Sequence, residues 1–308
     1  MMTSQRVTFV DQPRRRWVPL RVTHSTTAKD FPVKRAPLIP VLVTALSSVL
    51  LLGACSSAEP SESSSTGGAS DASANSLAAI QDSGVLTVGT EGTYKPFSYH
   101  EDGSGDLTGY DVEVITAVAE KLGVEPEFEE TQWDAIFAGL EAGRFDVIAN
   151  QVSITEEREA AYDFSTPYTV SPGVIVVPKD NSDISSFEDL AGKTTAQSLT
   201  SNWYTLAQDS GATVEAVEGW AQAITLLEQG RVDATVNDEL TYLDYVTQNP
   251  DADLKIAAET DDPSLSAVVL TKGNTELKDA INEALAELSS DGTLAEISDK
   301  YFGSDVSK

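Results

Sequence analysis

The chain has 308 residues, 41% of them hydrophobic, and a formal net charge of −29, so it can form two compact domains or one large one. From Cys55 onward it carries 12 basic and 47 acidic residues, a formal charge of −35. Such a surface repels nucleic acid and anionic membranes, so we expect neither to bind the body of the protein. The single cysteine excludes an internal disulfide.

The N-terminal region has the layout of a secretory signal, with a basic leader followed by apolar and small residues over 37–54. The phrase Leu52-Gly53-Ala54-Cys55 resembles the lipobox of bacterial lipoproteins, in which the cysteine is lipidated. We expect residues 1–54 to be a signal peptide, and residues 55–76 to be the lipidated Cys55 and a flexible tether. A transmembrane anchor is the alternative, at about the minimum spanning length.

The first part of the body alternates strands and helices in the order β-α-β-α-β. This order predicts an α/β sheet with ligand-binding loops at the carboxyl ends of its strands. Polar and aromatic residues follow those strands at Glu91, Tyr94, Trp133 and 150–158. The expected elements are a helix at 77–84, a strand at 85–90, a hairpin at 98–108, a helix at 110–122, a strand at 124–129, a helix at 133–141 and a strand at 144–149.

A second α/β pattern follows a proline-containing crossing segment at 163–172. Similar phrases, 142–147 and 229–234, each close a helix and open a strand, which indicates two similar lobes with a ligand cleft between them. The expected strands are 173–177, 194–197, 213–217, 232–236 and 267–271, and the expected helices are 187–191, 203–208, 220–229, 240–246, 277–288 and 294–301.

One helix start breaks a local rule. Thr155 is a good N-cap, but Arg158 places a cation in the first turn, at the wrong end of the helix dipole. An arginine fork beside free backbone N–H groups and the Ser153 hydroxyl predicts a site for a carboxylate. The alternative is an exposed arginine paired with Glu157 or Glu159.

With these residues in view, the body resembles solute-binding protein family 3, the polar amino-acid-binding proteins of ABC importers. This resemblance implies a two-lobed, periplasmic-binding-protein-like (type II) α/β fold, with 77–168 and 268–308 as lobe 1 and 169–267 as lobe 2. Three phrases are most similar to the cystine-binding branch: the loop that contains Glu91, 150–154, and 302–306. The phrases that carry the family resemblance are 89–97, 107–112, 145–158, 163–168, 187–193, 230–234, 291–294 and 301–303.

The resemblance also implies a ligand site. Arg158, assisted by Ser153, matches the clamp for the ligand α-carboxylate, and Asp238 matches the carboxylate that holds the α-ammonium. The second-lobe loop has Thr200 and Ser201 where the family usually has Gly-Thr. The other matching positions are Gln151, whose carbonyl takes the ammonium; Tyr94 and Trp133, aromatic walls beside Phe97; Glu91 and Asn150, which face the ligand side chain; and Ser201 and Asn202 in the second-lobe loop.

Each of these residues has a structural alternative. Asp238 suits the N-cap of a helix, Trp133 suits core packing, and Tyr94 with Phe97 suits a packed loop. A carboxylate such as Glu91 at the side-chain end of a ligand favours a distal ammonium, as in cystine or a basic amino acid, and its alternative is an acid that faces water.

We therefore expect an extracytoplasmic lipoprotein that binds an amino acid, most favourably cystine, and hands it to an ABC permease and its ATPase. We expect a monomer without a metal or cofactor, held to the membrane only through its lipid anchor. The alternatives are a receptor for another polar or basic amino acid and a secreted dehydratase or lyase with the same fold. The body has one histidine, His100, and no metal-spaced cluster, nucleophile elbow or P-loop, so we do not expect an enzyme.

Overall fold

The computed structural model describes residues 76–308, which lie within one structural unit, Thr66–Lys308. The predicted signal peptide, the lipobox with Cys55 and nearly all of the tether lie outside the described residues. Within the described part, no helix is both long enough and apolar enough to span a membrane.

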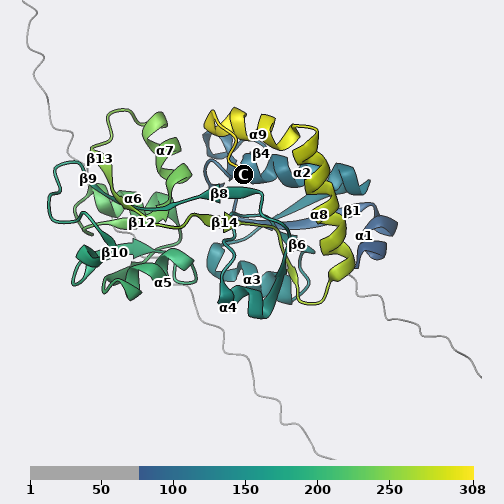
Figure 1. The fold of residues 1–308 in the computed structure, drawn as a ribbon, viewed down its shortest axis with the longest axis horizontal. Coiled ribbons are helices and arrows are strands. Elements are labelled where there is room, and N and C mark those ends of the chain that lie inside the picture. The colour runs from purple at the N-terminus through teal and green to yellow at the C-terminus, as the bar shows by residue number, and fades with distance from the viewer. Residues whose placement is uncertain (1–75) are drawn as a thin grey trace, which may run out of the picture. The chain divides into compact units, whose positions relative to one another are not determined.

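The first group of elements, called lobe 1 below, surrounds a five-stranded sheet of order β5-β1-β6-β15-β7 (Figure 1). Strands β5, β1 and β6 are parallel, whereas β15 is antiparallel to both of its neighbours. The strands are β1 (Val85–Thr90), β5 (Glu125–Glu130), β6 (Val147–Ile148), β7 (Tyr162–Phe164) and β15 (Val269–Thr271), with a small sheet of β2 (Thr93–Tyr94), β3 (Ser98–His100) and β4 (Leu107–Thr108). The helices are α1 (Leu77–Ser83), α2 (Tyr110–Leu122), α3 (Trp133–Glu141), α4 (Glu156–Ala161), α8 (Thr275–Ser290) and α9 (Thr293–Phe302).

The second group, called lobe 2, contains an antiparallel sheet of order β12-β9-β13 and the parallel pair β10-β11. A bridge between Thr195 and Ala234 links β10 to the segment that enters β12. The strands are β9 (Gly173–Pro178), β10 (Thr194–Gln197), β11 (Thr213–Ala216), β12 (Thr235–Asp238) and β13 (Leu254–Glu259). The helices are α5 (Asn202–Asp209), α6 (Trp220–Glu228) and α7 (Glu239–Gln248), with a 3₁₀ turn at Phe187–Leu190.

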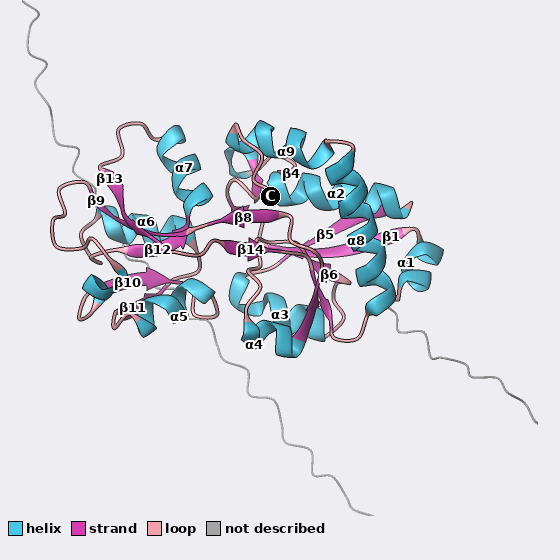
Figure 2. Cartoon of the chain, viewed as in Figure 1, coloured by secondary structure: helices cyan, strands magenta, loops and turns pink. Residues whose placement is uncertain are grey.

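Two short antiparallel strands connect the groups: β8 (Thr169–Ser171) and β14 (Ser264–Ser266). Figure 2 shows them as neighbouring arrows between the sheets of the two lobes. The apolar cores are separate on either side of this crossing. Lobe 1 packs around residues such as Leu86 and Ile115, and lobe 2 around residues such as Ile175, although Leu240 of α7 joins the lobe 1 cluster. Separate cores joined by two thin strands suit a hinge.

Most predicted elements are present, with shifted ends. The strand expected at 232–236 begins only at Thr235 and continues to Asp238, because Thr235 to Asp238 pair with β9, ending opposite Gly173. The strand expected at 144–149 is reduced to Val147–Ile148. Strands β7, β8, β13 and β14 were not predicted, because most of them are only three residues long and depend on partners distant in the sequence.

Candidate functional site

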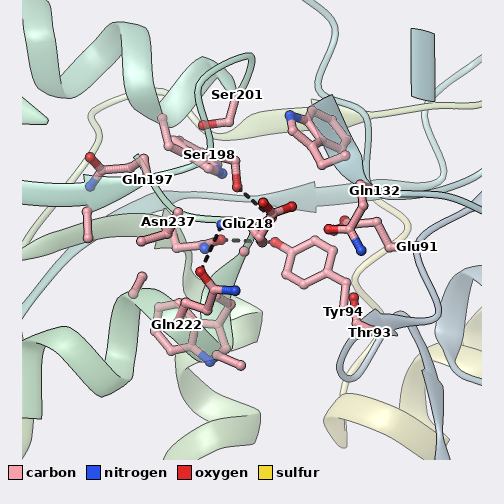
Figure 3. A pocket seen from close by; sticks show the side chains of 18 of the residues that line it. Glu91, Thr93, Tyr94, Gln132, Gln197, Ser198, Ser201, Glu218, Gln222 and Asn237 are labelled. Atoms are coloured by element: carbon pink, nitrogen blue, oxygen red, sulfur yellow. Dashed lines mark hydrogen bonds between the residues drawn. The ribbon is translucent and has the colours of Figure 1, made fainter. Parts of the chain in front are cut away.

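A cavity of about 230 Å³ lies between residues of the two lobes. In Figure 3, Glu91, Tyr94 and Gln132 approach it from lobe 1, and Ser198, Glu218 and Asn237 approach it from lobe 2. This volume is below the roughly 300–1,000 Å³ of pockets for drug-sized ligands, so it suits a small solute. Six of the predicted site residues line it: Glu91, Tyr94, Trp133, Gln151, Ser201 and Asn202. The other five, which are Phe97, Asn150, Ser153, Arg158 and Asp238, do not line it.

Glu91 directly follows β1 and is fixed by Asn150 from behind. The Asn150 side-chain oxygen accepts hydrogen bonds from the Glu91 backbone N–H (2.8 Å) and the Thr90 hydroxyl (3.0 Å). Its Nδ2 donates to Glu91 Oε2 at 2.7 Å. The other carboxylate oxygen, Oε1, would lie 3.8 Å from a Cβ placed on Gly219, so it faces the lobe 2 wall. Asn150 itself is fully buried and touches Glu91 rather than the cavity.

The electrostatic setting of Glu91 is unfavourable for a negative charge. Burial raises the pKa of Glu91 to about 7, the hydrogen bond from Asn150 opposes this rise, and the nearby acids Asp134 and Glu218 add to it. Glu218, which follows β11, lines the same cavity, and none of the lining residues is lysine, arginine or histidine. The cavity therefore offers negative charge without a cation to balance it.

Tyr94 bridges the lobes at the edge of the cavity. Its hydroxyl donates to Asn237 Oδ1 at 2.9 Å and accepts from the Thr241 hydroxyl at 3.1 Å. Phe97 stands behind it, with ring centroids 5.0 Å apart, and is fully buried in the lobe 1 core. For Phe97 the packing alternative is therefore what the structure shows, whereas Tyr94 reaches the cavity.

Arg158 is 8% exposed and does not pair with a surface glutamate, so the alternative of an exposed ion pair is wrong. Thr155 caps α4 as predicted, with its hydroxyl 3.2 Å from the Arg158 backbone nitrogen. The guanidinium donates to the carbonyls of Ser153 (2.9 Å) and Thr200 (3.1 Å) and lies over the rings of Trp133 and Phe137 at 5.4 and 5.3 Å. Burial lowers the pKa of Arg158 to about 10.

Asp238 is 3% exposed and caps α7, as its structural alternative predicted. Its Oδ1 accepts from the Ser171 hydroxyl at 2.7 Å and from the Leu240 backbone N–H at 2.9 Å. Burial raises the pKa of Asp238 to about 6. Among residues 76–308, neither Asp238 nor Arg158 forms a salt bridge. Neither side chain lines the cavity, and neither has a salt-bridge partner, although the Glu157 carboxylate acts electrostatically on Arg158.

The second-lobe loop holds the remaining predicted residues. Ser201 caps α5 by accepting from the Tyr204 backbone N–H at 3.0 Å, and Asn202 opens that helix. Thr200 is hydrogen-bonded to lobe 1. The Asp134 side chain accepts hydrogen bonds from the Thr200 backbone N–H at 3.1 Å and from the Thr200 hydroxyl at 2.8 Å. Ser153 is buried and receives a hydrogen bond from the Ser264 hydroxyl at 2.8 Å.

Sequence reasoning missed several wall residues, including Gln132, Trp203, Glu218, Trp220 and Asn237. The signal that could have found Glu218 was available, because it follows a predicted strand at the carboxyl edge of a parallel pair. The indole nitrogen of Trp133, which lines the cavity, is buried without a hydrogen-bond partner, so its N–H is a donor that no protein group accepts from. No group of three or more His, Cys, Asp or Glu residues in the described part could hold a metal ion.

Comparisons with known proteins agree with this arrangement. The family model "Bacterial extracellular solute-binding proteins, family 3" matches residues 86–304. The L-cystine-binding protein TcyA of Bacillus subtilis is 55% identical over 231 residues, which cover 75% of this chain and 86% of that protein.

Two solved structures are informative about conformation. The L-cystine solute receptor of Neisseria gonorrhoeae, unliganded and open, is 50% identical, with a TM-score of 0.53 over 76% of this chain and 99% of that one. An ancestral arginine-binding protein bound to arginine is 41% identical, with a TM-score of 0.67 over 71% of this chain and 99% of that one. The TM-score is higher for the less identical, arginine-bound structure than for the unliganded, open one.

The prediction of a two-lobed, periplasmic-binding-protein-like α/β fold is confirmed. A further relative, 50% identical over 74% of this chain and 89% of its own length, is named a probable amino-acid ABC transporter-binding protein of Haemophilus influenzae. The chain is an amino-acid-binding protein of the ABC-transporter type and belongs to family 3 of the bacterial extracellular solute-binding proteins.

Proposed function

We propose that this protein is a lipid-anchored receptor for cystine that delivers its ligand to an ABC permease and its ATPase. The observation that carries the proposal is the pair of buried charged groups that form no salt bridge among the described residues, Arg158 and Asp238. Buried charges in proteins are normally paired, because leaving water costs free energy that a partner must offset. The α-carboxylate and α-ammonium of an amino acid are the missing partners. Binding would require the Arg158 guanidinium to exchange the Thr200 carbonyl for a ligand oxygen.

Closure of the cleft follows from the positions of these groups. Arg158 belongs to lobe 1 and Asp238 to lobe 2, so a zwitterion that engages both favours the closed arrangement and shifts the hinge equilibrium toward it. We place the lobe boundaries in the crossing strands, with 77–168 and 268–308 as lobe 1 and 169–267 as lobe 2. Ser153 and the main chain of Gln151 would complete the α-carboxylate and α-ammonium contacts, and Ser201 and Asn202 would support them from lobe 2.

The far end of the cavity supports a ligand with a second cation. Glu91 and Glu218 both face the space, and the lining residues carry no positive charge. Cystine has a second ammonium at that end, and the similarity to a protein named for L-cystine favours it. A basic amino acid is the second candidate, because the same two carboxylates would hold a distal ammonium or guanidinium and a structural relative is bound to arginine.

Calorimetry tests the ligand. The chain is titrated with cystine, cysteine, lysine, arginine, histidine and glutamine under non-reducing conditions. We expect the tightest binding with cystine and, because the second charged end is missing, at least roughly tenfold weaker binding with glutamine. Tightest binding of lysine or arginine would select the basic-amino-acid alternative, and no heat with any of them, or turnover of one, would contradict the proposal.

Membrane attachment through Cys55 is tested separately. A Cys55→Ser variant, expressed in a bacterium that processes lipoproteins, is expected to leave the membrane fraction, while the parent chain remains in it. Equal retention of both would point to an anchor other than a lipid.

A further inference from the structure

Gln151 is held in an unusual backbone conformation at the wall of the cavity. Its φ is +49°, and the only other non-glycine residue with positive φ in residues 76–308 is Asp102, in an exposed turn. Such a conformation costs free energy for an L-residue with a side chain, because its Cβ crowds the following carbonyl oxygen, so surrounding contacts must maintain it. Gln151 is 7% exposed and lines the cavity, where that cost affects the shape of the site.

The contacts that maintain it come from one buried carboxylate. Asp111, in the first turn of α2, accepts the Gln151 backbone N–H through Oδ2 at 2.7 Å and the Gln151 side-chain Nε2 through Oδ1 at 2.6 Å. Asp111 is fully buried and forms no salt bridge among the described residues. Two parallel acceptors on one rigid group fix both the backbone and the side chain of Gln151.

The hydrogen bonds that begin at Asp111 and Gln151 continue to side chains of the crossing strand β8. The Gln151 Nε2 also donates to the Thr169 hydroxyl at 3.0 Å, and two residues further along β8 the Ser171 hydroxyl donates to Asp238 at 2.7 Å. Residues i and i+2 of a strand lie on one face, so a single face of β8 contacts both Gln151 and Asp238. The two acceptors assigned to the α-ammonium are therefore tied to the same strand, one from each lobe.

We propose that Asp111 is a positioning residue for the α-ammonium subsite: it locks Gln151 in the left-handed conformation that presents its main chain to the cavity. This inference rests on the proposed amino-acid-binding function. Asp111 does not touch the ligand and acts through Gln151, with Thr169 as the second point of attachment.

A double-mutant cycle separates this role from simple support of α2. An asparagine at position 111 can accept one Gln151 donor, but its amide nitrogen then confronts the other, so Asp111→Asn disrupts the lock. Glycine adopts positive φ without strain and lacks the side-chain donor, while it keeps the main-chain carbonyl. In a Gln151→Gly background only the backbone N–H at position 151 remains as a donor, and the side-chain oxygen of an asparagine at position 111 can accept it. Asp111→Asn should therefore change the ligand affinity little in that background.

The measurement is the affinity for cystine, and for the tightest ligand of the panel if that is another amino acid, by calorimetry. We expect Asp111→Asn to weaken binding about 10- to 100-fold and Gln151→Gly to weaken it about two- to fivefold. Adding Asp111→Asn to Gln151→Gly should weaken binding less than about threefold further. The matched control is Glu120→Gln, which removes an exposed carboxylate from α2, the helix that carries Asp111, and should leave the ligand affinity unchanged.

If Asp111→Asn weakens ligand binding by the same factor in the parent and in the Gln151→Gly background, the inference is overturned while the proposed function stays intact. Failure of the parent chain to bind any amino acid would overturn both. If Asp111→Asn does not fold, Thr169→Val keeps the shape of β8 and removes only the second attachment. Thr169→Val should weaken binding about three- to tenfold in the parent and not at all in the Gln151→Gly background. Equal weakening in the two backgrounds would show that the conformation of Gln151 is not what these residues control.

Discussion

Asn150 holds Glu91 at two points, by accepting its backbone N–H at 2.8 Å and donating to its Oε2 at 2.7 Å. One carboxylate oxygen is thereby occupied, and Oε1 is left to face the cavity wall at Gly219. Asn150 was predicted to face the ligand, yet it is fully buried. Its contribution to specificity would be exerted through the carboxylate that it orients.

Replacing Asn150 with alanine is expected to reduce both stability and selectivity. The Glu91 N–H would lose its acceptor, which costs about 1–3 kcal/mol of unfolding free energy for a buried donor, whereas the Thr90 hydroxyl keeps Ser98 Oγ as an acceptor at 2.7 Å. Glu91 would also be free to turn, so ligands with a distal ammonium should lose more affinity than glutamine does. Urea unfolding and calorimetry measure the two effects, and an equal loss of affinity for all ligands would show that Asn150 does not act through Glu91.

A Glu91→Gln variant tests the distal charge directly. The amide keeps the shape of the side chain but removes the negative charge, so cystine, lysine and arginine are expected to bind about 10- to 100-fold more weakly while glutamine changes little. Glu129→Gln, an exposed carboxylate on the edge strand β5, is the matched control. Unchanged affinity for cystine and the basic ligands would remove the distal-ammonium argument.

Arg158→Lys is expected to weaken binding of every amino acid by at least about 100-fold. Lysine keeps the charge, but it lacks the planar fork that grips a carboxylate at two points and lies over aromatic rings. The exposed Arg144→Lys serves as the control with the same chemical change. Retention of affinity in Arg158→Lys would mean that the carboxylate is bound elsewhere.

The pH dependence of stability should be opposite to that of a protein stabilised by ion-paired carboxylates. Burial raises the pKa of Glu91 and Asp111 to about 7 and that of Asp238 to about 6. The folded protein therefore binds more protons than the unfolded chain between about pH 4 and pH 7, and its free energy of unfolding falls as pH rises through that window.

Urea unfolding of the unliganded protein at several pH values checks this expectation. Each group contributes up to about 1.4 kcal/mol per pH unit within its window, so Glu91→Gln should flatten the slope by about that amount between pH 5 and pH 7. Glu129→Gln should leave the slope unchanged. A parent protein whose stability rises from pH 5 to pH 7 would contradict the assignment of these three carboxylates as buried without a cation.

The elements that the sequence predicted well are those with strong local signals. Helix α2 has apolar residues at helical spacing and ends at Gly123, whose φ of +76° suits a glycine cap. Thr155 capped α4 as expected. The crossing strands β8 and β14 carry no such signal, because each is three residues long and each is stabilised by the other across almost 100 residues of sequence.

The sequence by itself determined the family, the two α/β patterns and six of the residues that line the cavity, because these follow from periodicity, caps and motifs that neighbouring residues carry. Only the tertiary structure decided that Asn150 backs Glu91, that Glu218 adds a second carboxylate, and that Asp111 holds Gln151. Those relationships depend on groups separated by 40 residues or more in the chain. Their partners are selected by burial and by the register of strands, and no local pattern encodes either one.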